Sequence, residues 1–196
     1  MKCWKIVDAG DFRTYARDFL IFYAKNPNKF KHCNSFWAQF IPENYDTYLQ
    51  NNKCFKEGIS MFGEINEIAL LTMNGPKTSI HIDHTVDLNR DVKARLNIPL
   101  MNCEGSYTAF YNFTPEEFNQ FKLSSVNRTY GDHVSKGTTK WWDFDDSVAK
   151  PATKVELIQP TILRTSYPHS VTCEGKRFPR ITMTISFKED LSKYLC

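Results

Sequence analysis

The segment Arg180–Phe187 alternates strictly between polar and apolar residues. Such alternation predicts a β-strand, because successive side chains of a strand point to opposite faces of its sheet. One face would carry Ile181, Met183, Ile185 and Phe187, and the other would carry Arg180, Thr182, Thr184 and Ser186. A buried guanidinium needs a partner, so an arginine on an inward-facing strand predicts a polar site inside the fold.

The chain from residue 65 onward carries further strand patterns, separated by residues that favour turns. The predicted strands include 68–73, 78–83, 94–100, 107–111, 155–159, 161–166 and 169–172. Pro99 cannot donate to a hydrogen-bond ladder, so we expect its strand to lie at a sheet edge or to end there. These patterns predict a mainly β fold with its core in residues 65–188.

Residues 1–64 are expected to form a helical support for this β core. The segment 11–25 has aromatic residues at helical spacing, and Asp11 is in position to cap the helix. A second short helix is predicted over 42–50, whereas 30–40 is aromatic without a regular period. Amphipathic helices of this kind would pack on one sheet. A chain of 196 residues organised in this way fits a single domain, 1–196.

A polar segment from about 124 to 150 lacks the period of a helix or of a strand. It contains Gly131 and Gly137. Long irregular inserts in compact domains are usually functional loops. We therefore predict that this insert is a mobile lid that becomes ordered around substrate.

The formal net charge of +3 is small, and lysine and arginine are scattered along the chain. This pattern does not favour nucleic acid or a membrane surface as a partner. The six cysteines are widely spaced, so we expect reduced thiols in a reducing compartment. The sequence has no apolar run typical of a signal peptide or a membrane span. The expected protein is soluble and cytoplasmic.

Two residues of metal-ligating type occur close together in Ser79–Asp83. On a strand, His81 and Asp83 project from the same face, while the residues beside them point the other way. A second imidazole would complete a 2-His-1-carboxylate set, which leaves positions on a non-haem iron open. His169, on a later predicted strand, is the candidate. An H-x-D pattern alone arises by chance, so the interpretation depends on the residues that accompany it.

Four further residues are candidates for holding a cosubstrate that carries a carboxylate. Arg180 suits bidentate recognition of a carboxylate, and Thr182 on the same strand face would add a hydroxyl donor. Arg95 and Asn97 share the polar face of their predicted strand. A structural ion pair explains Arg95 equally well, and Arg180 could also pair with a structural acid.

Taken in order, His81-Ile82-Asp83, His169 and Arg180-Ile181-Thr182 resemble the H-x-D, distal His and R-x-S/T motifs of the iron(II)/2-oxoglutarate-dependent dioxygenase superfamily. The segment from Arg95 to Tyr111 is similar to a bacterial and phage subgroup related to aspartyl/asparaginyl and prolyl hydroxylases. The resemblance covers roughly residues 65–188, and the N-terminal helices carry no motif of it.

The resemblance implies a double-stranded β-helix, a jelly-roll or cupin-like sandwich, with Fe(2+) held by His81, Asp83 and His169. It implies 2-oxoglutarate as cosubstrate, with its far carboxylate on Arg180, and O2 as oxidant. Halogenases of the family have a small residue where this chain has Asp83. The implied reaction is therefore hydroxylation or a related oxidation, with release of succinate and CO2.

Two other classes of function remain open from the sequence. One is a cosubstrate-free mononuclear metal enzyme of cupin type, which Arg180 and Thr182 argue against. The other is a non-catalytic β-sandwich that serves as a binding module. The primary substrate is also open: a protein side chain, a free amino acid and a nucleobase all fit, with a weak preference for a prolyl, aspartyl or asparaginyl side chain.

Overall fold

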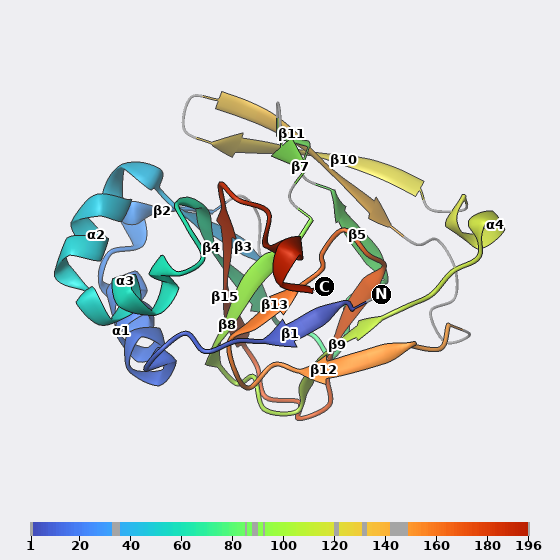
Figure 1. Cartoon of the computed structure of the whole chain (residues 1–196), viewed down its shortest axis with the longest axis horizontal. Helices are drawn as coiled ribbons and strands as arrows, with labels where there is room; N and C mark the ends of the chain where they lie inside the picture. The colour runs from blue at the N-terminus through green and yellow to red at the C-terminus, as the bar shows by residue number, and fades with distance from the viewer. Residues whose placement is uncertain are drawn as a thin grey trace.

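The computed structural model of the chain describes residues 2–32, 36–84, 86–87, 90–91, 93–119, 122–130, 133–141 and 149–195, with side chains outside 84–92 and 120–148. Over these residues the fold is mainly β, as the sequence predicts. Two antiparallel sheets face each other, and three helices cover one of them (Figure 1).

The first sheet has seven described strands, and its central strand is the alternating segment. Their order is β1 (Trp4–Ile6), β13 (Thr161–Leu163), β8 (Arg95–Met101), β15 (Arg180–Phe187), β4 (Ile65–Met73), β3 (Trp37–Phe40) and β2 (Phe30–His32). The outer face of this sheet is apolar, which is why the helices pack on it.

The second sheet has six described strands. Their order is β10 (Lys122–Tyr130), β11 (His133–Trp141), β5 (His81–His84), β14 (His169–Cys173), β9 (Ser106–Phe110) and β12 (Thr153–Glu156). Two short strands, β6 (Val86–Asp87) and β7 (Arg90–Asp91), pair with each other. From β4 to β15 the chain passes repeatedly from one sheet to the other.

Local sequence features explain where most of the helices begin and end. In α1 (Phe12–Lys25), the backbone N–H of Thr14 donates to the Asp11 side chain at 3.3 Å, so the predicted cap is confirmed. The predicted second helix is a 3₁₀ turn, η2 (Pro42–Asn44), followed by α2 (Tyr45–Asn51). A third helix, α3 (Lys53–Ser60), was not predicted.

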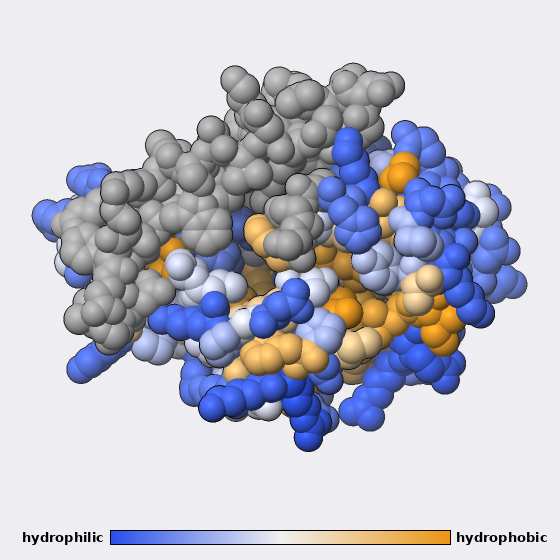
Figure 2. All heavy atoms as spheres, turned by 180° about the vertical axis from the view of Figure 1, so that it is seen from behind, coloured by the Kyte–Doolittle hydropathy of each residue, from blue (hydrophilic) through white to orange (hydrophobic). Residues whose placement is uncertain are grey.

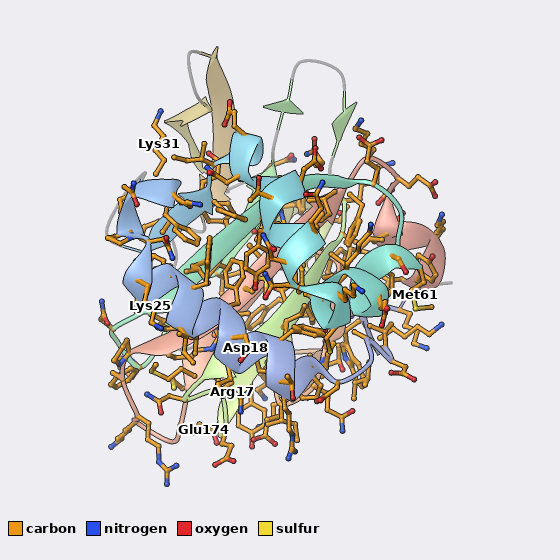
Figure 3. All side chains as sticks on the ribbon, turned by 90° about the vertical axis from the view of Figure 1, so that its left-hand side faces the viewer. Arg17, Asp18, Lys25, Lys31, Met61 and Glu174 are labelled. Atoms are coloured by element: carbon orange, nitrogen blue, oxygen red, sulfur yellow. The ribbon has the colours of Figure 1, made fainter. Side chains whose placement is uncertain are left out.

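The polar run around Asn52 explains the missed helix, because it resembles a helix end. Asn52 in fact closes α2 and also precedes the first residue of α3. Seen from the helical side, α1, α2 and α3 lie across the first sheet, and α1 carries Arg17 and Asp18 on its exposed side (Figure 3). Three short elements complete the described helices: α4 (Pro115–Phe118) and the 3₁₀ helices η1 (Pro27–Lys29) and η3 (Leu191–Leu195).

An aromatic cluster joins these helices to the first sheet. Phe19 of α1 is fully buried. Its ring centroid lies between 5.3 and 6.3 Å from those of Phe22, Phe30, Phe40, Tyr48 and Phe55. Burial of so many rings around one side chain makes the cluster a main source of stability.

The alternation of β15 is confirmed, and both of its faces are buried. Its apolar residues join the core under the helices. Its polar residues, from Arg180 to Ser186, face the interior between the sheets, with at most 4% of their surface exposed. The sandwich therefore has an apolar outer layer and a largely polar inner wall.

Two strand predictions near β15 are wrong. The strand that contains Pro99 is not an edge strand, because β8 lies between β13 and β15. Its pairing with β13 ends at Asn97, so proline is tolerated beyond that point, where β8 has one neighbour. The segment 30–40 forms β2 and β3, and β3 shows no alternation because all four of its residues are buried.

The prediction of an irregular insert at about 124–150 is also wrong for most of its length. β10 and β11 pair over nine positions as a hairpin, and β11 pairs in turn with β5. Pairing with neighbouring strands makes this stretch β-structure, and a local sequence pattern does not show such pairing. The lid prediction for 142–148 lies outside the described residues.

The surface seen from behind is not uniformly polar. Apolar side chains gather in its hollowed centre, and polar ones form the rim (Figure 2).

We expect Phe19→Ala to lower the free energy of unfolding by about 3–5 kcal/mol, because it removes a ring that packs against five others. Urea titration measures this as a lower midpoint. Ile21→Ala, on the same helix but 46% exposed, serves as control and should change stability by less than about 0.5 kcal/mol. Equal losses in the two variants would show that the cluster does not stabilise the fold.

Candidate metal centre

Two neighbouring strands of the second sheet bring the predicted ligands together. His81 of β5 and His169 of β14 are direct cross-strand partners, and their ring centroids are 4.4 Å apart. Asp83 follows on the same face of β5, with its Oδ1 3.8 Å from Nε2 of His81. One ligand atom from each of the three side chains lies within 4.8 Å of the other two. The described residues contain no other such group of His, Cys, Asp or Glu side chains.

Backbone carbonyls orient both imidazoles. Nδ1 of His81 lies 2.8 Å from the carbonyl oxygen of Ser79, and Nδ1 of His169 lies 2.8 Å from that of Tyr167. In each case Nδ1–H donates to a residue two positions earlier. This hydrogen bond fixes the tautomer and leaves the Nε2 lone pair available as a ligand.

The two histidines differ in burial. Complete burial, with a smaller effect from His81, lowers the pKa of His169 to about 4, although Asp83 and the bond to Tyr167 oppose the shift. His169 is therefore neutral above that pH, as a metal ligand must be. The side chains of His81 and Asp83 are 13% and 25% exposed, so the site is closed on the His169 side and open on the other.

Arg180 lies on the inner wall of the facing sheet. Its pKa is lowered by burial, whereas the Cys103 and Cys173 thiols act in the opposite direction. No carboxylate of the described residues contributes to this shift, and Nε has no hydrogen-bond partner among them. Cys173 ends the strand that begins at His169, so Arg180 lies towards the far end of the chamber from the metal ligands.

Thr182 and Asn97 share this inner wall. Thr182 is 1% exposed, and its hydroxyl lies 3.9 Å from Sγ of Cys103. Asn97 pairs in register with Thr184, and its side-chain nitrogen donates to the carbonyl of Arg95 at 3.3 Å. The structure thus places both residues on the face predicted for them.

Arg95 is engaged within the protein. Its Nη1 donates to Oε2 of Glu67 at 2.8 Å, and its guanidinium carbon lies 5.5 Å from the Trp37 ring centroid. Both charged side chains are almost fully buried. Of the two interpretations of Arg95, the structural ion pair is the one the geometry favours. The sequence analysis assigned no role to Glu67, although an acidic residue directly before the apolar strand 68–73 is unusual and could have drawn attention to it.

Several buried polar atoms on the facing inner walls have no hydrogen-bond partner among the described residues. They are Nε of Arg180, Oγ1 of Thr184, Oε1 of Glu67, Oγ of Ser106 and Oγ1 of Thr108. Buried polar groups in native proteins are nearly always hydrogen-bonded. The interior between the sheets is therefore unusually polar. Two imidazoles and one carboxylate with an open side suit a divalent transition metal.

Comparison of the sequence with protein-family models and with curated proteins gives no match. No helix of the described residues has the length and apolar character needed to cross a membrane.

We expect His81→Ala and His169→Ala each to weaken binding of Fe(II) or Mn(II) by more than about a hundred-fold, because loss of a ligand should exceed the effect of losing an outer partner. Anaerobic titration calorimetry with the metal alone measures this affinity. His32→Ala, an exposed histidine on β2, is the control and should bind as the wild type does. Wild-type affinity in either test variant would show that the cluster does not hold the metal.

Proposed function

We propose that this chain is an iron(II)- and 2-oxoglutarate-dependent oxygenase, a hydroxylase of a protein or amino-acid side chain that releases succinate and CO2. The observation that carries the proposal is the pairing of a His81/Asp83/His169 cluster with a buried Arg180 that has no acidic partner among the described residues. A metal site alone has no need of this arginine. A dicarboxylate that binds the metal through one end would need such an arginine at its other end.

The fold we propose is a double-stranded β-helix. Four strands of the first sheet lie in the order β13-β8-β15-β4, and four of the second lie in the order β5-β14-β9-β12. Along the chain these strands pass between the sheets as a jelly roll requires. The histidine strands are then adjacent in one sheet, and the arginine strand lies in the other.

In this proposal His81, Asp83 and His169 hold the iron through Nε2, a carboxylate oxygen and Nε2. Iron with 2-oxoglutarate and O2 supplies the oxidising chemistry for inserting a hydroxyl group at a C–H bond. Arg180 binds the distal carboxylate of 2-oxoglutarate through its guanidinium fork, and the Thr182 hydroxyl lies on the same strand face to donate beside it.

Burial gives these contacts their strength. Arg180 and Thr182 are 4% and 1% exposed, so water competes little for the bound carboxylate. The more exposed side, at His81 and Asp83, is where O2 and the primary substrate would approach. The buried end at Arg180 and Thr182 would thus hold the cosubstrate, and the more exposed end at His81 and Asp83 would admit the substrate.

We expect Arg180→Gln to lower 2-oxoglutarate affinity by about ten- to a hundred-fold, because it removes the charge and the bidentate hydrogen bond. Arg180→Lys should recover part of the loss, since it keeps the charge without the planar fork. Titration of anaerobic, iron-loaded protein with 2-oxoglutarate, followed by succinate assay in air, measures both binding and turnover.

Arg177→Gln is the matched control, because Arg177 lies three residues earlier with 69% of its side chain exposed. It should bind 2-oxoglutarate as the wild type does. Iron affinity should survive in all three variants. Wild-type cosubstrate affinity in a folded Arg180→Gln protein, or no succinate from the wild type, would count against the proposed function.

A further inference from the structure

Arg180 is the first residue of β15, and neighbouring strands hold its backbone on one side only. On that side it is the register partner of Met73 in β4. On the other side, the pairing of β15 with β8 begins at Ile181, which lies opposite Met101. The ladder with β8 therefore stops one residue short of Arg180. Because β8 ends at Met101, any anchor on this side has to come from the residues that follow it.

The turn after β8 makes two contacts with β15. The side-chain amide of Asn102 donates to the carbonyl oxygen of Pro179 at 2.8 Å. The thiol of Cys103 donates to the carbonyl oxygen of Ile181, with 3.3 Å between sulfur and oxygen. These two carbonyls belong to the residues directly before and directly after Arg180. The turn therefore holds the chain on both sides of the arginine.

The conformation of the turn suits these contacts. Asn102 has a φ of 53°, in the left-handed region that asparagine tolerates better than most residues other than glycine. Cys103 is 6% exposed, and its sulfur also lies 3.4 Å from the carbonyl oxygen of Met101 and 3.9 Å from the hydroxyl of Thr182. The thiol thus bridges Met101 and Ile181, the last register pair of β8 and β15.

The residues that flank Asn102 and Cys103 have little packing of their own. Met101 is 39% exposed, and the side chain of Glu104 is 83% exposed. The turn also borders an open cleft at the surface. The hydrogen bonds of Asn102 and Cys103 are therefore the contacts that tie this turn to β15.

The place of the Arg180 guanidinium depends on its backbone. Among the described residues, Nε of Arg180 has no hydrogen-bond partner that would fix the side chain from its far end. A guanidinium binds a carboxylate through a planar fork, so the bond is sensitive to the direction in which the fork points. An anchor on each side of Arg180 limits that direction before any ligand binds.

We infer that Asn102 and Cys103 are positioning residues, which fix the chain on both sides of Arg180 and so hold its guanidinium ready for the distal carboxylate of the cosubstrate. This inference rests on the proposed function, because that function gives Arg180 its ligand. A purely structural role for the two contacts makes a different prediction. Their loss would then lower stability and leave the affinity of the folded protein for the cosubstrate unchanged.

Asn102→Gly and Cys103→Ala test the two contacts. Glycine adopts a positive φ without strain, so Asn102→Gly removes the amide donor and leaves the turn conformation accessible. Each variant should bind 2-oxoglutarate about two- to ten-fold more weakly, as expected for loss of one ordinary hydrogen bond, with iron affinity unchanged. Cys103→Ser keeps a hydroxyl donor and should recover part of the loss. Anaerobic titration of the iron-loaded full chain measures these affinities.

Cys54→Ala is the matched control, because the Cys54 thiol also approaches a backbone carbonyl, that of Asp11 at 3.7 Å, on the helical side of the molecule. It should bind 2-oxoglutarate as the wild type does. Wild-type affinity in both Asn102→Gly and Cys103→Ala would overturn the inference.

The decisive comparison combines Asn102→Gly with Arg180→Gln. If Asn102 acts through Arg180, the double variant should bind 2-oxoglutarate no more weakly than Arg180→Gln alone. Independent, additive losses would overturn the inference, because they would show that the turn acts on the cosubstrate by another route.

Amide hydrogen exchange tests the anchor without any cosubstrate. Asn102→Gly and Cys103→Ala should each speed exchange in residues 180–182 and leave α1 unchanged, whereas Cys54→Ala should not affect 180–182. Faster exchange there, with unchanged 2-oxoglutarate affinity in Arg180→Gln, would defeat the proposed function and keep the anchor. Succinate formation by a protein whose exchange in 180–182 is insensitive to both substitutions would keep the function and overturn the inference.

Discussion

The burial of β15 on both faces is the constraint on which the rest of the structure depends. Its apolar face completes the core beneath α1, α2 and α3, and its polar face lines the chamber. Desolvating a row of hydroxyls and a guanidinium is costly, and the aromatic cluster around Phe19 on the other side of the sheet offsets that cost. The two faces of β15 therefore serve different roles. Substitutions on the apolar face should affect mainly stability, and substitutions on the polar face should affect mainly the site.

The metal centre depends on register in the same way. His81 and His169 meet because they are opposite each other in one antiparallel pair, and a slip of one residue would turn His169 to the outer face. Two contacts hold that register. β14 pairs with β9 over its full length from His169 to Cys173, and the backbone N–H of Asp83 donates to the carbonyl of Thr165 at 2.9 Å.

Sequence reasoning recovered the parts that a local pattern determines. The alternation of β15, the cap of α1 and the shared face of His81 and Asp83 all follow from periodicity or from a short-range hydrogen bond. It failed where pairing partners decide the outcome. β3 is buried on both faces and shows no alternation, and β10 and β11 are strands because they extend the sheet at β5. The partner of Arg95 is Glu67, 28 residues earlier, and only the strand order brings them together.

The interior is electrically asymmetric, and this bears on what it holds. Among the described residues, one end has the buried guanidinium of Arg180, whose Nε has no hydrogen-bond partner, and the other has the ion pair of Glu67 and Arg95. Replacing a buried ion pair with apolar residues is often neutral or stabilising, so stability alone does not explain Glu67 and Arg95 on the inner wall. On the proposed function, Arg180 would bind the distal carboxylate of the cosubstrate, and the substrate would approach at the opposite end, near His81, Asp83 and His169.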